Sequence, residues 1–298
     1  MTRHFLKLLS ILITGSVLFQ QSCLKISEEP KGAGTVFDGC IETGNSSSFE
    51  IVTLNLQGFP KAGDKTIESV KDLIRSINPD VIALQELRSE TEFNNLLMEL
   101  EGWDGRFWPE LNDVWNLAYL FKTSEVEIDD SRTRVIFTDD VYAFPRAPFE
   151  IYVRHKPTDI GTYLINIHLK CCDGQENEER RRMAAEKLAD YIHTIRSSDP
   201  VIILGDFNDN ITDDPSSANV FYSLVSAPAE YHFTDMDIAM GSNIWWSYPS
   251  YPGHLDHFVV TNELFSSVDT TMTLRPDICY GDYFNEISDH RPLELILH

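Results

Sequence analysis

Short apolar runs alternate with longer helical repeats over residues 49–298. The runs 81–84 and 201–204 are continuous, which is typical of buried strands, whereas apolar residues recur at helical spacing over 66–77. The same criteria predict strands at 50–56, 81–84, 117–122, 149–153, 163–168, 201–204, 255–260 and 293–297, and helices at 66–77, 90–100 and 176–196. This order lacks the strict alternation of an α/β barrel. It suits an α/β fold in which two sheets pack face to face with helices outside.

Residues 1–22 have the pattern of a signal peptide. Arg3 and Lys7 precede an apolar stretch at 8–19, and no acidic residue occurs there. A helix that spans a bilayer needs roughly 20 apolar residues, so this stretch is too short for one. Cys23 follows at a site that resembles a bacterial lipoprotein cleavage site, although the glutamines two and three positions before it are unusual there. We therefore expect a lipid on Cys23, with an ordinary cleaved signal as the alternative.

Residues 23–48 separate this leader from the rest of the chain. After the cysteine they are polar and rich in glycine and serine, a composition typical of a flexible tether. Residues 49–298 are numerous enough for one substantial core and are predicted to form a single domain. We expect an exported monomer that its lipid holds at the bacterial cell envelope, in the periplasm or at the cell surface, or else a secreted one.

Charge and cysteine content limit the kinds of binding, disulfide and metal site that are expected. The formal net charge of −23 opposes tight, sequence-independent binding to nucleic acid, but it leaves room for a nuclease that uses a metal ion. Four cysteines follow Cys23, so three disulfide pairings are possible in an exported protein. Cys171 and Cys172 are adjacent, and each is expected to pair with a distant cysteine, Cys40 or Cys279. Their spacing disfavours a structural zinc site.

The run 201–204 ends in the polar segment Gly205-Asp206-Phe207-Asn208-Asp209-Asn210. Open α/β sheets commonly bind ligands at the carboxyl ends of their strands. Asp206 and Asn208 point to the same side of an extended backbone, and an acid beside an amide suits activation of a water next to a phosphoryl oxygen. A calcium loop is disfavoured because Ile211 occupies the position that requires glycine.

Further polar residues stand near the ends of other predicted strands. Glu86 closes the run 81–84, where a buried acid needs a positive partner such as a hard divalent cation. Asn55, near the end of the preceding strand, could orient the same ligands, although a turn residue is the simpler interpretation. Asp289 and His290 come just before the last strand.

Two histidines and one arginine complete the candidate chemistry. A lone histidine is usually structural, but His168 and His290 both accompany acids near strand ends. Asp256 could orient one of them, and the sequence does not decide which. Arg146 is flanked by prolines and suits bidentate contact with phosphate, with a surface arginine as the alternative. By contrast, the run 180–182 lies among glutamates and is predicted to be a solvated helix face.

Taken in order, these motifs resemble the endonuclease/exonuclease/phosphatase superfamily over residues 50–298. The resemblance is carried by Leu54-Asn55, Gln85-Glu86, Arg146 with Pro148, Ile167-His168, Gly205-Asp206-Phe207-Asn208, Leu255-Asp256-His257 and Ser288-Asp289-His290. It implies a four-layer α/β sandwich of two mixed β-sheets and Mg²⁺-dependent cleavage of phosphate esters, with Mn²⁺ or Ca²⁺ as other candidates. It also implies that Glu86 holds the metal with Asn55 and Asp289 nearby.

The resemblance implies the remaining roles as well. Asp206 would activate or orient the attacking water, and Asn208 would contact the substrate phosphate together with Arg146. His168 and His290, oriented by Asp256, would stabilise the phosphoryl centre and help the leaving oxygen depart.

One departure from the family's pattern affects which substrate we expect. Residues 115–122 resemble the central strand of deoxyribonuclease I-like members, but Asp113 and Trp115 stand near the places where those enzymes carry a glutamate and a tyrosine. We expect an exported metal-dependent phosphodiesterase, first of all a nuclease that holds DNA or RNA weakly. A sphingomyelinase-like phospholipid hydrolase or a sugar or inositol phosphate hydrolase is the alternative, and a non-catalytic surface lipoprotein is a third. The aromatic segment 245–251 is expected to border the site, although packing explains it more simply.

Overall fold

Two mixed β-sheets form the centre of the computed structural model, which describes residues 34–39, 41, 47–110, 113–214 and 219–298. The first sheet has the strand order β12-β13-β1-β2-β4-β3, with β1 Phe49–Phe59, β2 Val81–Leu87, β3 Trp103–Trp108, β4 Asn116–Lys122, β12 Val268–Thr273 and β13 Leu293–Leu297. The second has the order β10-β11-β9-β8-β7-β5, with β6 beside β7; its strands are β5 Val126–Ile128, β6 Arg134–Val135, β7 Phe149–His155, β8 Gly161–His168, β9 Val201–Asp206, β10 Tyr231–Phe233 and β11 Asp256–Thr261. The pairs β1–β2 and β8–β9 are parallel, and the other pairs are antiparallel.

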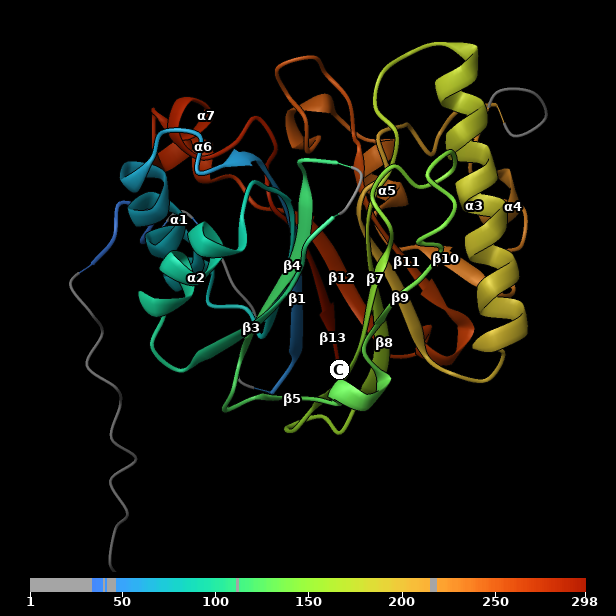
Figure 1. Ribbon diagram of the computed structural model, residues 1–298, viewed down its shortest axis with the longest axis horizontal. Helices are drawn as coiled ribbons and strands as arrows, with labels where there is room; N and C mark the ends of the chain where they lie inside the picture. Colours follow the sequence, from blue (N-terminus) through green and yellow to red (C-terminus); the bar gives the residue numbers. More distant parts are fainter. Residues whose placement is uncertain (1–33, 40, 42–46, 111–112, 215–218) are drawn as a thin grey trace, which may run out of the picture. The chain divides into compact units, whose positions relative to one another are not determined.

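Helices cover the outer faces of both sheets. They are α1 Asp64–Ile77, α2 Glu90–Met98, α3 Gln175–Ile195, α4 Tyr222–Val225, α5 Met236–Ala239, α6 Pro276–Cys279 and α7 Tyr283–Glu286. Figure 1 shows α1 and α2 outside the first sheet and the long helix α3 outside the second. The arrangement confirms the predicted α/β sandwich with helices outside.

Alternation along the strands divides the apolar residues among three layers. Ile51 of β1 and Ile202 of β9 point into the core between the sheets. Their neighbours Val52 and Ile203 point outward, Val52 into the core beneath α1 and α2, and Ile203 into the core beneath α3. Because successive strand residues face opposite sides, a strand buried on both faces has a continuous apolar sequence. This is why the runs 81–84 and 201–204 predicted strands correctly.

All predicted strands and helices are present, with boundaries that differ by a few residues. The strands that were not predicted are the short or peripheral ones: β3, β5, β6, β10 and β12. Every residue of β3 is only partly buried, and most of β12 is as well, so their sequences lack a clear apolar period.

The predicted leader 1–22, Cys23 and most of the predicted tether lie outside the described residues. One residue in the described part of the predicted tether packs on the domain: Phe37 is fully buried, and its ring meets that of Tyr280 edge to face. None of the helices in the described part of the chain is long and apolar enough to cross a membrane.

Glu294 of β13 is a buried acid distant in sequence from the site motifs. It is fully buried, and neither of its carboxylate oxygens has a hydrogen-bond partner within the described residues. Burial, with the negative charges of Glu50 and Asp80 nearby, raises the pKa of Glu294 to about 8 despite the opposing effect of Lys122. The folded protein therefore favours the neutral carboxyl, and ionisation of Glu294 disfavours folding.

We predict that Glu294→Gln stabilises the protein at high pH. In the unfolded chain this acid ionises above about pH 4.3, so the wild type loses stability as pH rises from there to about 8, whereas the variant does not. The gain is expected to be roughly 3–5 kcal/mol at pH 8 and near zero at pH 4. Urea unfolding at both values measures it, and an equal effect at both would contradict a protonated Glu294.

Candidate active site

The core between the sheets becomes polar toward one end of the strands. In the second sheet, Asp206 pairs in register with His168 on one side and with Asp256 on the other. Leu204 and Phe258, two positions away, belong to the core between the sheets, so the side chains of Asp206 and Asp256 face the same layer. Three chemically active side chains from three strands therefore meet at one level of the sandwich.

A buried hydrogen-bonded layer separates these groups from the apolar core. Gln85 of the first sheet donates from Nε2 to Thr53 Oγ1 at 3.0 Å and to Asn166 Oδ1 of the second sheet at 2.8 Å. Asn166 donates from Nδ2 to the carbonyl of Leu84 at 3.0 Å. Buried amide groups that lose their hydrogen-bond partners cost free energy, so these bonds resist separation of the two sheets directly beneath the site.

Glycine is required immediately before Asp206. Gly205 has φ of +135°, and a Cβ added there would lie 2.1 Å from the carbonyl oxygen of Ile167 on the neighbouring strand. Any other residue would therefore clash with β8 or change the backbone direction that places Asp206. The backbone N–H of Asn208 then bonds Asp206 Oδ1 at 2.9 Å, with Asn208 itself at a positive φ.

Asn55 joins the acids of the two sheets. Its Nδ2 donates to Glu86 Oε1 at 3.0 Å and to Asp206 Oδ2 at 2.9 Å. Its Oδ1 accepts the backbone N–H of Gln57 at 2.8 Å, so the amide nitrogen, and not the oxygen, faces the carboxylates. A metal-ligand role for Asn55 would need the amide turned over. In this orientation Asn55 holds the two carboxylates close together.

His290 is paired with Asp256, which decides the question that the sequence left open. Nδ1 of His290 donates to Asp256 Oδ2 at 2.7 Å, and Nε2 lies 3.9 Å from Asp206 Oδ2. Burial alone would lower the pKa of His290, but Asp256, with help from Asp206 and Asp289, raises it to about 10. His290 is therefore an imidazolium at neutral pH.

His168 differs from His290 in its protonation state. Its Nε2 lies 3.6 Å from Asp206 Oδ2 and 3.8 Å from Glu86 Oε1. Burial, with the positive charges of Arg146 and His290, holds the pKa of His168 well below its usual value. The site therefore contains one neutral and one charged imidazole.

Asp206 lies between these imidazoles. Burial raises the pKa of Asp206 to about 7, with contributions from Asp256 and Glu86 and against the opposing effects of His290 and Asn55. A carboxylate with this pKa is matched to proton transfer near neutral pH.

Arg146 is buried and anchored at the edge of the site. Nε donates to the carbonyl of His168 at 3.0 Å, Nη2 donates to the carbonyl of Leu169, and Nη1 donates to Asp113 Oδ2 at 3.0 Å. Three of its five N–H groups are thus used within the protein, which leaves two for a phosphate. Asp113, one of the residues that departs from the deoxyribonuclease I pattern, fixes this guanidinium.

One cavity of about 470 Å³ is bordered by Glu86, Arg146, His168, Asp206 and His290. Asn55 and Asp256 do not line it and contact it only through their bonds to these side chains. Asn208 and Asp289 line it as well. Of the aromatic residues, Trp115, Tyr248 and Tyr251 also line it. The cavity therefore combines acids and imidazoles with flat apolar surfaces.

The match between this chain and a known family covers most of its length. Residues 52–290 match the profile of the Endonuclease/Exonuclease/phosphatase family. The chain belongs to that family. Its members are hydrolases that act on phosphoester bonds, and they generally depend on divalent metal ions.

The following relatives are distant from this chain in sequence. YbhP of Escherichia coli (strain K12), described as uncharacterized, is 23% identical over 179 residues, which cover 54% of this chain and 67% of that protein. The endonuclease/exonuclease/phosphatase from Bacteroides vulgatus has a TM-score of 0.65 at 16% identity and covers 84% of this chain and 98% of that chain.

Two further structures share the fold. D. rerio TDP2 complexed with single-strand DNA product has a TM-score of 0.64 at 16% identity and covers 85% of this chain and 99% of that chain. The mannosyl-6-phosphatase Bt3783 of Bacteroides thetaiotaomicron VPI-5482 has a TM-score of 0.63 at 14% identity and covers 84% of this chain and 100% of that chain. These likenesses show the fold alone, since the identities are low.

The donor atoms of the cavity fit a hard divalent cation. Glu86 and Asp289 both line the cavity with carboxylates, which Mg²⁺ and Mn²⁺ prefer as ligands. Asp256 Oδ1 is buried without a hydrogen-bond partner within the described part of the chain. Three residues at the site, Gln57, Glu86 and Asn208, also have positive φ, a strained conformation that is common at functional sites.

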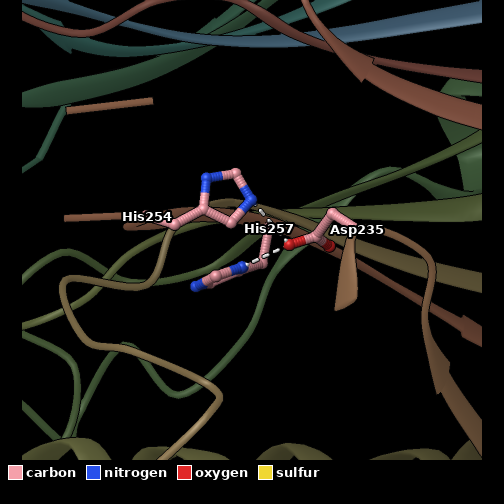
Figure 2. Close-up of side chains that lie close together, drawn as sticks. All are labelled: Asp235, His254 and His257. Carbon is pink, nitrogen blue, oxygen red and sulfur yellow. Dashed lines mark hydrogen bonds and ion pairs between the residues drawn. The ribbon is translucent and has the colours of Figure 1, made fainter. Parts of the chain in front are cut away.

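The described residues hold two groups of potential metal ligands, Asp206 with Asp256 and His290 at the site, and a second cluster of Asp235, His254 and His257. Figure 2 shows both imidazoles of the second cluster beside the Asp235 carboxylate. Asp235 Oδ2 accepts from His254 Nε2 at 3.0 Å and from His257 Nδ1 at 2.6 Å, and its Oδ1 accepts from the N–H of Phe258. The remaining nitrogen of His254 accepts from the N–H of Ser247, and that of His257 bonds the carbonyl of Asp209. The ligand atoms are thus satisfied without a cation.

The charge state of this second cluster follows from its hydrogen bonds. Both nitrogens of His257 face acceptors, so His257 is an imidazolium, and Asp235 raises its pKa against the effect of burial. The two histidines in turn hold the pKa of Asp235 well below its usual value although burial opposes this. The pair supports the Asp209 backbone, three residues from Asp206.

The prediction for the basic run 180–182 was wrong at its central residue. Arg181 is buried, and its Nε and Nη2 reach Asp209 Oδ2 at 2.9 and 2.8 Å. Arg182 pairs with Glu179 at the surface, as expected. A single buried position inside a charged helical run leaves little trace in the apolar periodicity, so the sequence pattern missed it.

The prediction that each adjacent cysteine pairs with a distant one was also wrong. Cys171 and Cys172 are free thiols, while Cys279 is disulfide-bonded. Cys40 lies outside the described residues.

We predict that Arg181→Lys weakens the fold, whereas Arg182→Lys does not. Lysine cannot reproduce the paired contacts to Asp209 and leaves this partly buried acid poorly compensated. The free energy of unfolding is expected to fall by about 2–4 kcal/mol for Arg181→Lys and by less than about 0.5 kcal/mol for Arg182→Lys. Urea unfolding of both variants measures the difference, and equal values would contradict the buried pairing.

Proposed function

We propose that this family member is an exported, divalent-metal-dependent phosphodiesterase whose first substrate class is nucleic acid. The observation that carries the proposal is the placement of Asp206 between an imidazolium, His290, and a neutral imidazole, His168, on the wall of one cavity. This arrangement suits in-line displacement at phosphorus, in which a base, charge-stabilising donors and a cation act together.

Asp206 is assigned the role of general base. It would accept a proton from water as the water oxygen bonds to phosphorus and the bond from phosphorus to the leaving oxygen breaks. Its raised pKa, about 7, makes it a better proton acceptor than an ordinary aspartate while leaving it largely ionised near pH 8. Asn55 and the N–H of Asn208 hold both of its oxygens in place.

The two imidazoles are assigned different tasks because their charges differ. His290, held by Asp256, would stabilise the negative charge that develops on the phosphoryl oxygens or donate its proton to the leaving oxygen. His168 is neutral and can bind a phosphoryl oxygen through Nε2 without adding positive charge. The two remaining N–H groups of Arg146 and the amide of Asn208 would position the substrate phosphate.

Glu86 and Asp289 would hold the cation, and Asn55 would position Glu86 beside Asp206. A bound divalent cation offsets negative charge on the phosphate and so supplies electrostatic stabilisation of the transition state.

Nucleic acid is proposed as the first substrate because aromatic rings flank the phosphate chemistry. Tyr248 packs against His290 with ring centroids 4.8 Å apart, and Tyr251 is largely exposed on the cavity wall. Such rings can stack unpaired bases. D. rerio TDP2, which shares the fold, is known in complex with single-strand DNA product. The net charge of −23 argues that the substrate is held weakly and released readily.

A sugar phosphate or a phospholipid headgroup is the second candidate. A cavity of about 470 Å³ can enclose one such group, and the acidic surface does not oppose it as it opposes a polyanion. A mannosyl-6-phosphatase also shares the fold.

Export and attachment to the cell envelope are proposed from the leader pattern alone. Residues 1–22 would direct export, a lipid on Cys23 would anchor the chain to a membrane, and the protein would act as a monomer in the periplasm or at the cell surface.

A substrate panel tests the proposed activity. Purified protein with Mg²⁺ or Mn²⁺ is expected to hydrolyse DNA or RNA faster than sphingomyelin, inositol phosphates or mannose 6-phosphate. Glu86→Gln and Asp206→Asn are each expected to lower kcat/KM by roughly 10²–10⁴-fold.

Glu68→Gln, on the exposed face of α1, is the matched control and should leave the rate unchanged. Faster hydrolysis of a sugar phosphate or phospholipid would select the second candidate. If no phosphate ester is cleaved, or if Asp206→Asn cleaves as fast as wild type, the proposal fails.

The pH dependence provides a separate test of the two charged groups. Activity should rise with pH as Asp206 loses its proton. This rise should occur at or below about pH 7, because a bound cation favours the carboxylate. Activity should then fall as His290 loses its proton toward about pH 10. Asp256→Asn removes the main source of the raised His290 pKa, so the falling limb of kcat/KM should move to lower pH. An unchanged falling limb would contradict the assignment.

A further inference from the structure

Two adjacent thiols border the catalytic cavity and have no role in the proposed hydrolysis. Cys171 and Cys172 follow β8 three and four residues after His168, and both line the cavity. Their sulfur atoms lie 2.8 Å apart, and Cys172 is exposed. Cys279 is disulfide-bonded, so these are the only free cysteines in the described part of the chain.

Hydrogen bonds connect this dithiol turn to the catalytic loop. Arg181 donates from Nη1 to the carbonyls of Lys170 at 2.7 Å and Cys172 at 3.1 Å, while its other nitrogens bind Asp209. One residue earlier in the turn, the carbonyl of Leu169 accepts from the Nδ2 of Asn208 at 3.2 Å. A shift in the turn backbone would therefore reach Asn208 and Asp209.

We propose that Cys171 and Cys172 form a redox-active vicinal dithiol, which a low-molecular-weight disulfide oxidises, and whose oxidation state changes the geometry of the catalytic cavity. The thiol chemistry stands independently of the proposed function, whereas its effect on turnover rests on that function.

The geometry of adjacent cysteines makes such a bond reversible. Neighbouring Cα atoms across a trans peptide are about 3.8 Å apart, whereas an unstrained disulfide joins Cα atoms about 4.4–6.8 Å apart. A disulfide between Cys171 and Cys172 is therefore strained and more easily reduced than an ordinary structural one. Its formation also requires the turn to move, which would displace the Cys172 carbonyl that Arg181 holds.

The reaction is a double thiol–disulfide exchange. One sulfur of the pair, as a thiolate, attacks the small disulfide, and one small thiol departs with a proton. The other sulfur then attacks the sulfur of the mixed disulfide that belongs to the protein, which closes the protein disulfide and releases the second small thiol. The two cysteine protons end on the released thiols, and the two electrons from the protein reduce the oxidant. Lys170 Nζ lies 3.8 Å from Cys171 Sγ, where an ammonium group stabilises negative charge on sulfur.

Thiol trapping tests the dithiol directly. The purified full chain is equilibrated in buffers of oxidised and reduced glutathione, alkylated, and analysed by mass spectrometry of the peptide that contains both cysteines. We expect oxidation to remove two hydrogens from this peptide, and dithiothreitol to restore two alkylatable thiols. Cys171→Ser and Cys172→Ser should instead retain a glutathione adduct, because each lacks the second thiol. Two alkylated thiols under oxidising conditions, or a stable glutathione adduct on the wild type, would overturn the proposal.

Turnover tests the coupling to the cavity. Oxidised and reduced wild type are expected to differ in kcat/KM by about tenfold or more, because small displacements of positioning groups cost much of the rate. The double variant Cys171→Ser/Cys172→Ser should show the same kcat/KM in both buffers. A disulfide that forms without any change in wild-type kcat/KM would overturn the coupling. A chain that forms the disulfide but hydrolyses no phosphate ester in either state would instead count against the proposed function.

Discussion

The site depends on the burial of two carboxylates side by side at the end of the layer between two sheets. Asp206 and Asp256 are paired in register and have almost no exposed surface. Two buried negative charges are tolerated only where positive charge and hydrogen bonds compensate them. The imidazolium of His290 does this for both, since it bonds one acid and lies 3.9 Å from the other.

The surrounding structure serves to keep this arrangement fixed. Beneath it, buried amides from both sheets replace apolar packing with directed hydrogen bonds, so the sheets cannot slide without breaking them. Beside it, the loop after β9 is held by Arg181 through Asp209 and by His257 through the Asp209 carbonyl. Acidic side chains outnumber cationic ones in the cavity lining, and a divalent cation held by Glu86 and Asp289 would neutralise part of this negative charge.

The layered fold could be predicted from sequence because strands buried on both faces have continuous apolar runs, as in 201–204. Several residues of the candidate site could be picked out because polar groups at the ends of such runs are costly to bury without compensation, as at Asp206 and Glu86, which the structure places on one cavity. The partner of Asp256, the burial of Arg181 and the amide orientation of Asn55 could not be predicted. Each depends on contacts between residues distant in sequence or on a side-chain rotation. The adjacent cysteines were mispredicted for a related reason, since sequence spacing does not tell which sulfur atoms face a common cavity.

Anomalous diffraction from crystals equilibrated with Mn²⁺ tests the central claim most directly, because it locates the cation without reference to any substrate. The account predicts one strong peak within ligand distance, about 2–2.6 Å, of a Glu86 carboxylate oxygen and inside the cavity that holds Asp206 and His290. A peak confined to other acids of the surface, with none at Glu86 under saturating Mn²⁺, would contradict it.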